Sequence, residues 1–454
     1  MVPLLYRLLR PLARAMIWLF YRRLEVQGVE NVPAAGPLLV AANHPNLFLD
    51  PLLLGATQPR ALAFLAKATL FRSRLLGHFL AACGVLPVYR RSDSPGESAK
   101  NELTFEACYH HLERGGAIAL FPEGLSHGRQ AVMPLKTGCA RIALEAESQN
   151  SFQLGVQIAP VGFYLPQRHL FRSDALVIYD SPLDPAHHFA NYREAPQEAV
   201  RQLTAELERR LRRLTLHLPQ AEDEALIDKL REILAAPGAV ADRLEMDQVL
   251  VDAVKYFQRD DPARYRRLRR EVLNYGRLLD ALGLKHGHLG RTYRLGAVLR
   301  YLAPRVALAI GGLPVFLFGA FNNLLPYKIP AWTARALSRD VVEVATVKLL
   351  TGMVAFPVFY ALQSWLVARS VGLRLALLYF LALPVSGFLA LRYQEALLGL
   401  IEEGRVFFLH FLRKNQMARL AHLGRPIGEE LARCREEFLS LPERAPRPDT
   451  VHGE

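Results

Sequence analysis

Apolar and polar positions between residues 24 and 214 follow a pattern of short apolar runs separated by segments with helical spacing. Seven runs have the length of a strand: RLEVQG, PLLVAA, ALAFLA, GVLPVY, AIALFP, QIAPVGFYL and ALVIYD. Helical spacing marks residues 72–84, 99–116 and 136–149 between them. Because strands and helices alternate, this segment is predicted to be an α/β domain with a mostly parallel sheet flanked by helices.

The last third of the chain has a different pattern, with apolar runs close to bilayer length. Residues 349–368 and 373–391 are joined only by RSVG, which predicts a C-terminal transmembrane hairpin. A shorter apolar run at 306–321 is a third span or a re-entrant segment. Basic residues lie before the hairpin as well as at its turn. Their distribution therefore does not indicate which end of the hairpin faces the cytosol.

These patterns divide the chain of 454 residues into five predicted segments. They are an amphipathic membrane-surface helix at 1–23, the α/β domain at 24–215, a soluble helical region at 216–303, a membrane region at 304–392 and a charged helical tail at 393–454. Arg7, Arg10 and Arg14 form one stripe of the first helix, which favours an anionic membrane surface. The alternative is that this helix packs on its own domain.

Charge and cysteine content indicate which binding partners and which cellular compartment to expect. The chain has 56 Lys and Arg against 43 Asp and Glu, a net charge of +13, which favours anionic partners such as nucleic acid, acidic lipid or phosphorylated substrates. Its four cysteines have neither the spacing of metal ligands nor the density of a disulfide scaffold. A reducing compartment is expected, with the thiols buried in the core.

His44 and Asp50 stand in the segment NHPNLFLD, which follows the predicted strand PLLVAA. Asp50 followed by Pro51 is a helix-start signal and predicts Asp50 as the N-cap. The loop between them can fold His44 back onto Asp50, whose carboxylate would then orient the imidazole and stabilise its protonated form. The alternative is a surface histidine in a loop, with Asp50 only capping its helix.

Other polar residues follow the predicted strands. Arg90 and Arg91 end GVLPVYRR, and a pair of guanidinium groups suits a phosphate. Glu123 follows the strand AIALFP, at the end of the sheet where α/β proteins gather ligands. Lys136 stands at the start of a predicted helix, where backbone N–H groups favour an anion.

The segment GLSHG around Ser126 fits the nucleophile elbow of serine hydrolases. That elbow requires a helix directly after the serine, whereas GRQAVMP follows here without helical spacing before Lys136. A serine esterase or lipase that uses Ser126 therefore remains an alternative that the local pattern does not favour.

Four segments in order, NHPNLFLD, GVLPVYRR, FPEG and IAPVGF, resemble the four motifs of the glycerolipid (PlsC-type) acyltransferase superfamily. The resemblance covers about residues 20–215. Five residues separate His44 from Asp50 where the common pattern has four, and FPEGLSH replaces the usual Thr-Arg-Ser continuation. These departures, with the C-terminal hairpin, are similar to the branch that acylates glycerol-3-phosphate or dihydroxyacetone phosphate. Lysophosphatidate is the alternative acceptor.

The resemblance implies a membrane-bound O-acyltransferase of phospholipid synthesis whose catalytic domain faces the cytosol. His44 would act as general base and Asp50 would orient it. Arg90 and Arg91 would hold the acceptor phosphate, Glu123 and Gly124 would shape the glycerol pocket, and Lys136 is a further candidate for the phosphate. The expected partners are a phosphorylated glycerol acceptor, membrane lipid and an acyl donor, either acyl-CoA or acyl carrier protein. No metal, cofactor or nucleic-acid partner is expected.

Overall fold

The chain forms two compact units. The computed structural model describes residues 4–89, 101–168, 170–218, 222–234, 239–289, 295–338 and 340–441. The sheet unit comprises residues 1–221 together with two short later segments, 239–244 and 338–346. The helical unit comprises residues 222–238, 245–337 and 347–454.

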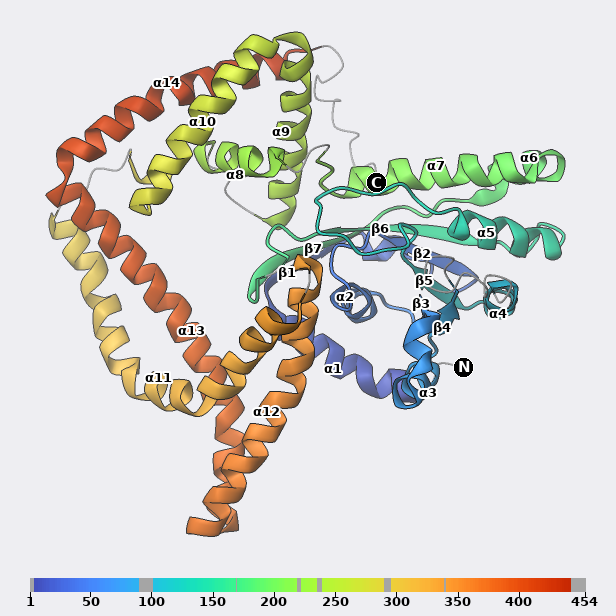
Figure 1. Cartoon of the computed structure of the whole chain (residues 1–454), viewed down its shortest axis with the longest axis horizontal. Coiled ribbons are helices and arrows are strands. Elements are labelled where there is room, and N and C mark those ends of the chain that lie inside the picture. The colour runs from blue at the N-terminus through green and yellow to red at the C-terminus, as the bar shows by residue number, and fades with distance from the viewer. Residues whose placement is uncertain are drawn as a thin grey trace, which may run out of the picture. The chain divides into compact units, whose positions relative to one another are not determined.

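The sheet unit is built on seven strands in the order β1-β7-β6-β2-β5-β3-β4 (Figure 1). The strands are β1 (Tyr21–Gln27), β2 (Leu38–Ala42), β3 (Leu62–Lys67), β4 (Leu86–Val88), β5 (Ala117–Leu120), β6 (Gln157–Tyr164) and β7 (Ser173–Tyr179). Neighbouring strands are parallel except β6 and β7, which are antiparallel. All seven strands lie where the apolar runs predict them, so the predicted α/β class is confirmed.

Helices cover both faces of this sheet, which is why its central strands are apolar throughout. The helices of the unit are α1 (Leu4–Phe20), α2 (Leu49–Thr57), α3 (Arg74–Ala82), α4 (Asn101–Glu113), α5 (Gly138–Gln149), α6 (Phe189–Glu194) and α7 (Pro196–Leu214). One core joins α4, α5 and α7 to β2, β5 and β6, and every residue of β2 is buried. The strands β2, β5, β6, β3 and β4 run in one direction, so their carboxyl ends meet at one edge of the sheet.

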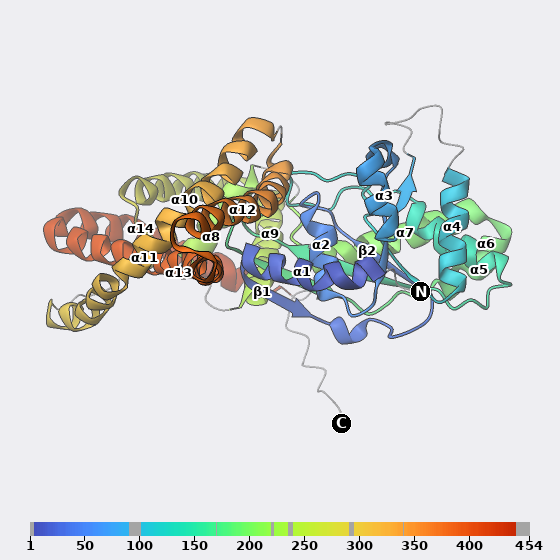
Figure 2. The same cartoon turned by 90° about the horizontal axis from the view of Figure 1, so that it is seen from below.

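The first helix, α1, lies along α2 (Figure 2). The Arg10 and Arg14 side chains donate to backbone carbonyls at the C-terminal end of α2, where the helix dipole favours positive charge. Two arginines of the predicted lipid-facing stripe therefore have partners within the protein. The large apolar side chains that α1 leaves exposed are those of Leu8, Leu12, Trp18 and Leu19.

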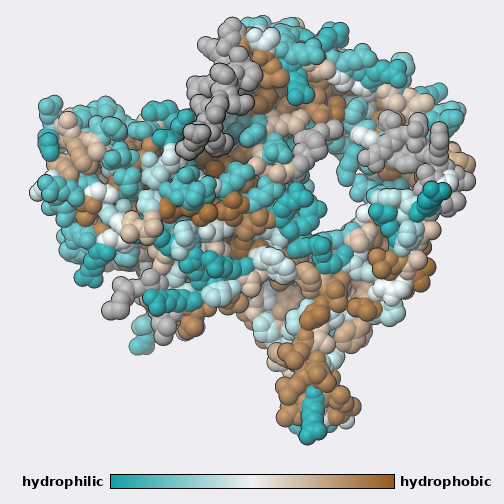
Figure 3. Space-filling model, turned by 180° about the vertical axis from the view of Figure 1, so that it is seen from behind, coloured by the Kyte–Doolittle hydropathy of each residue, from teal (hydrophilic) through white to brown (hydrophobic). Residues whose placement is uncertain are grey.

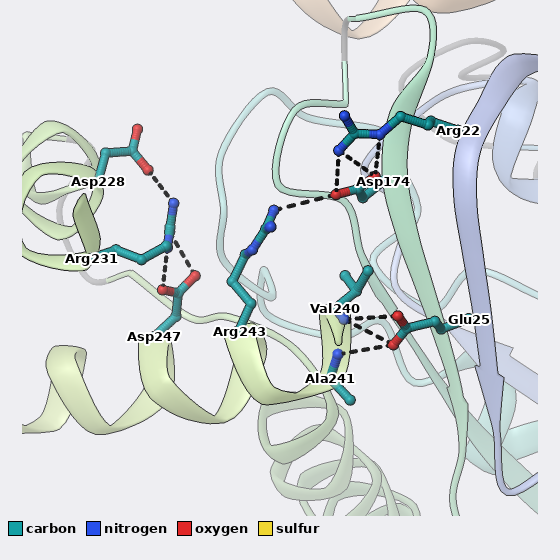
Figure 4. Close-up of polar contacts among 9 residues, drawn as sticks. All are labelled: Arg22, Glu25, Asp174, Asp228, Arg231, Val240, Ala241, Arg243 and Asp247. Carbon is teal, nitrogen blue, oxygen red and sulfur yellow. Dashed lines mark hydrogen bonds and ion pairs between the residues drawn. The ribbon is translucent and has the colours of Figure 1, made fainter. Parts of the chain in front are cut away.

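Polar contacts join the segment 239–244 to the sheet (Figure 4). Glu25 of β1 accepts the first two N–H groups of α9 (Val240–Asp260), at 2.9 and 3.2 Å, where a carboxylate complements the helix dipole. Asp174 of β7 is buried and pairs with Arg22 at 3.1 Å and with Arg243 of α9 at 3.5 Å. The first turn of α9 is thus held by two carboxylates, one from the edge strand β1 and one from its neighbour β7.

The helical unit contains α8 (Asp223–Ile233), most of α9, α10 (Pro262–Leu282), α11 (Leu295–Leu337), most of α12 (Val341–Val371), α13 (Leu373–Leu412) and α14 (Lys414–Leu439). Within it, Arg231 of α8 pairs with Asp228 and with the buried Asp247 of α9 (Figure 4). Among the described residues, three helices are long and apolar enough to cross a membrane: Arg300–Leu337, Val342–Val371 and Leu373–Leu412.

The two helices predicted as a hairpin expose apolar side chains over much of their length (Figure 3). The shorter run at 306–321 lies inside the continuous helix α11. Exposed leucine, valine and phenylalanine side chains on helices of this length are typical of a lipid environment, and they indicate membrane association.

Candidate active site

The His44 and Asp50 side chains meet at the carboxyl end of β2. His44 follows this strand by two residues, the loop after it reverses direction, and Asp50 lies in the first turn of α2. Nδ1 of His44 lies 2.8 Å from Oδ2 of Asp50. The carboxylate only accepts, so Nδ1 is assigned as the protonated nitrogen and Nε2 is left as the acceptor. The predicted pairing of the two residues is therefore present in the fold.

The predicted N-cap role of Asp50 is wrong. Helix α2 begins at Leu49, and Phe48 occupies the N-cap position. The Asp50 carboxylate turns back into the loop, where Oδ2 also accepts the backbone N–H of Asn46 at 2.7 Å. Because this oxygen already binds Asn46 and His44, the carboxylate stabilises the loop rather than the helix start.

Burial determines the electrostatics of the pair. The Asp50 side chain is fully buried, and burial raises the pKa of its carboxyl to about 6, while the hydrogen bond from His44 opposes that rise. The His44 side chain keeps 12% of its surface exposed. A buried carboxylate beside a partly exposed imidazole is the arrangement that orients a general base and stabilises its protonated form.

The next strand, β5, holds His44 from a second side. The imidazole stacks on the Phe121 ring, with centroids 4.0 Å apart and planes 13° from parallel. The backbone N–H of His44 donates to Oε1 of Glu123 at 2.9 Å. Both contacts come from the segment that directly follows β5, so the position of His44 depends on the pairing of β2 with β5.

Glu123 is buried and accepts hydrogen bonds from several neighbouring groups. Besides His44, its carboxylate accepts the N–H of Met133 at 2.8 Å and contacts Nε2 of His127 at 2.5 Å. The side chain is fully buried. His127 was not among the residues predicted from the sequence. The one feature that could have indicated it is its position four residues after Glu123, in a segment rich in turn residues.

Gly124, the residue after Glu123, lies beside Lys136. Gly124 has φ +75°, and a Cβ there would lie 3.2 Å from Cγ of Lys136. The N–H of Lys136 donates to the carbonyl of Pro122 at 2.7 Å. The Lys136 side chain is exposed just before α5, within reach of an anion at that helix end. Arg90 and Arg91 lie outside the described residues.

A buried arginine, Arg168, joins the loops around the pair and was not found from the sequence. Its carbonyl accepts Nδ2 of Asn46 at 3.1 Å, and its guanidinium donates to the carbonyl of Gly128. A small cavity of about 30 Å³ lies beside it, lined also by Asn43 and His127. A larger hollow of about 710 Å³, between α4, α5 and α7, is lined by neither member of the pair.

The hydrolase arrangement predicted as an alternative around Ser126 does not form. Residues 121–137 are all described and contain no helix, because α5 begins only at Gly138. Among the described residues, no group of three His, Cys, Asp or Glu side chains is placed to hold a metal ion.

Comparison with known proteins finds a family model that matches part of the sheet unit. Residues 23–164 match the family model described as Acyltransferase. The chain is 23% identical to glycerol-3-phosphate O-acyltransferase 2 of Saccharomyces cerevisiae, over 76% of this chain and 63% of that protein. It is 27% identical to a 1-acyl-sn-glycerol-3-phosphate acyltransferase of Bacillus subtilis, over 43% of this chain and 90% of that protein.

Among solved structures, the chain matches the 1-acyl-sn-glycerophosphate acyltransferase of Thermotoga maritima. The match has a TM-score of 0.34 and 20% identity, and it covers 45% of this chain and 77% of that chain. The chain spans just under two thirds of the length of the two curated relatives that match most of it.

Proposed function

Because residues 23–164 belong to the acyltransferase family, we propose that the chain moves a fatty acyl group from an acyl thioester to a hydroxyl of glycerol-3-phosphate or dihydroxyacetone phosphate. The donor is acyl-CoA or acyl carrier protein. One observation carries this proposal: Nδ1 of His44 is held by the buried Asp50, which leaves Nε2 as a base at the carboxyl ends of the parallel strands β2, β5 and β6.

In the proposed reaction, Nε2 of His44 takes the proton of the acceptor hydroxyl as its oxygen attacks the thioester carbonyl. The new C–O bond forms, the C–S bond breaks, and the leaving thiolate takes the proton back from the imidazolium. Asp50 stabilises the imidazolium formed in between. A hydroxyl is far less acidic than an imidazolium, so proton transfer must accompany attack and both groups must be pre-positioned.

The acceptor is the first thing to test. The purified chain is assayed with labelled acyl-CoA against glycerol-3-phosphate, dihydroxyacetone phosphate and lysophosphatidate. We expect the highest kcat/KM with one of the first two, since the yeast relative, a glycerol-3-phosphate O-acyltransferase, matches most of this chain. A preference for lysophosphatidate would support the second candidate, which the Bacillus relative favours. Absence of transfer to all three would reject the proposal.

Arg90 is the proposed phosphate ligand. It follows β4, a strand parallel to β3, by two residues in the sequence. Arg90→Ala should raise the KM of the acceptor at least tenfold and leave the KM of the acyl donor nearly unchanged, because an unpaired buried phosphate costs several kcal/mol. Arg74→Ala, at an exposed position of α3, is the control. An equal increase in the KM of both substrates would instead make Lys136 the proposed phosphate ligand.

We also propose that the sheet unit faces the cytosol, where phosphorylated glycerols and acyl thioesters are made. Three apolar helices would anchor the chain, so alkaline carbonate should not release it from membranes. An impermeant protease should leave the sheet unit intact in sealed cells and cleave it after permeabilisation. Cleavage in sealed cells would place the unit on the opposite side.

A further inference from the structure

The start of the apolar helix α12 belongs to the sheet unit. Residues 338–346 are part of that unit, although almost 300 residues separate them from His44. Val342, Ala345 and Thr346 are buried, with 4%, 0% and 5% of their surface exposed. Their spacing of three and four residues places them on one face of the helix. This face therefore packs against the sheet unit over its first turn and a half.

That face is bonded to the first loop of the candidate active site and lies close to the second. Oγ1 of Thr346 accepts the backbone N–H of Phe48 at 3.1 Å, inside the loop between His44 and Asp50. On the second loop, a Cβ built on Gly128 would lie 3.6 Å from Oδ1 of Asp340 and 3.8 Å from Val342. Side chains near the start of α12 thus reach the loop after β2 and the loop after β5.

In the loop after β2, the backbone N–H groups of every second residue donate to side-chain oxygens. The N–H of His44 donates to Glu123, the N–H of Asn46 to Asp50, and the N–H of Phe48 to Thr346. Each alternate N–H is thus satisfied by one side-chain oxygen. An irregular loop has no backbone ladder to hold it, so its shape depends on such bonds. Of the three donors, Phe48 is the nearest to Asp50 in the sequence, and Thr346 supplies its acceptor.

We propose that Thr346 is a positioning residue for the His44–Asp50 pair. Its hydroxyl fixes Phe48, the residue from which α2 starts, and thereby the angle at which Asp50 meets the imidazole. The acyltransferase segment 23–164 is then incomplete by itself and requires a side chain from the start of a membrane-type helix. This inference rests on the proposed acyl transfer and names a further residue that the reaction needs.

The test compares full-length variants in detergent. Thr346→Val keeps the side-chain shape and removes the acceptor, Thr346→Ala removes it without a methyl group facing the N–H, and Thr346→Ser retains it. We expect kcat to fall on the order of 10- to 100-fold for Val and Ala, as for a small misplacement of a catalytic group. The KM of both substrates should stay within about twofold, and the Ser variant should retain the wild-type rate.

Thr351→Val is the matched control, since it makes the same change on the same helix at a residue whose hydroxyl bonds Thr333 instead. It should leave kcat unchanged. Wild-type kcat in both Thr346→Val and Thr346→Ala would overturn the inference, as would an equal loss in the Thr351 control. If the wild-type chain itself transfers no acyl group, the proposed function fails first, so the two failures are distinguishable.

A second measurement separates positioning from simple destabilisation. If Thr346 acts through the pair, Thr346→Val should cost little extra rate in a chain that already carries Asp50→Asn, because the geometry it maintains is already impaired. Full additivity of the two losses in kcat would contradict a positioning role. The comparison uses folded protein only, checked by equal thermal midpoints of the single and double variants.

Discussion

Replacing His44 with alanine should lower the rate of acyl transfer by about 10²–10⁴-fold, the usual contribution of a general base. The variant should fold normally, because the imidazole lies at a strand end and its backbone N–H still donates to Glu123. The measurement is kcat with labelled acyl-CoA and the preferred acceptor, together with a thermal melt. Near-normal turnover in folded His44→Ala would reject the proposed mechanism.

Two further variants make this result specific. Asp50→Asn removes the charge beside the imidazole while it keeps the size of the side chain, so it should also lose rate if Asp50 stabilises the imidazolium. Ser126→Ala should retain full activity, since no helix follows Ser126 as the hydrolase arrangement requires. Loss of activity in Ser126→Ala, with His44→Ala active, would instead support an esterase.

Glu123→Gln should lower both the stability and the turnover of the protein. The carboxylate binds three donors, the N–H groups of His44 and Met133 and Nε2 of His127. An amide places an NH₂ group against at least one of them, and each buried donor left unpaired costs about 1–3 kcal/mol. Because one of the three belongs to His44, we expect kcat to fall at least tenfold along with the thermal midpoint.

Glu147 offers a matched control for this prediction. It is equally buried and accepts two backbone N–H groups, those of Leu154 and Val156, but it lies at the end of α5, before β6 begins. Glu147→Gln should therefore lower the thermal midpoint while kcat measured below that midpoint stays close to wild type. If both variants lost turnover in parallel, Glu123 would have only a general structural role.

The amino-acid sequence by itself determined the strands, the helices between them and the apolar helices of the last third. These features depend on the period of apolar positions, which is a local property. Local chemistry also predicted that the chain would turn between His44 and Asp50, because a proline-containing loop stands between a strand and a helix start. It was misleading for the cap: Asp50 followed by Pro51 resembles a helix start, but the carboxylate is held by the loop.

Only the tertiary structure decided what holds the pair in place. Glu123 meets His44 because β2 pairs with β5, and Thr346 meets Phe48 because α12 begins against that same loop. No periodicity in the sequence marks a bond between residues 79 or 298 positions apart. Such a bond depends on the packing of whole elements, where the partner of each buried N–H is the oxygen that the fold brings near it. The pairing of His44 with Asp50 was therefore predictable from local sequence, and the distant side chains that contact its loop were not.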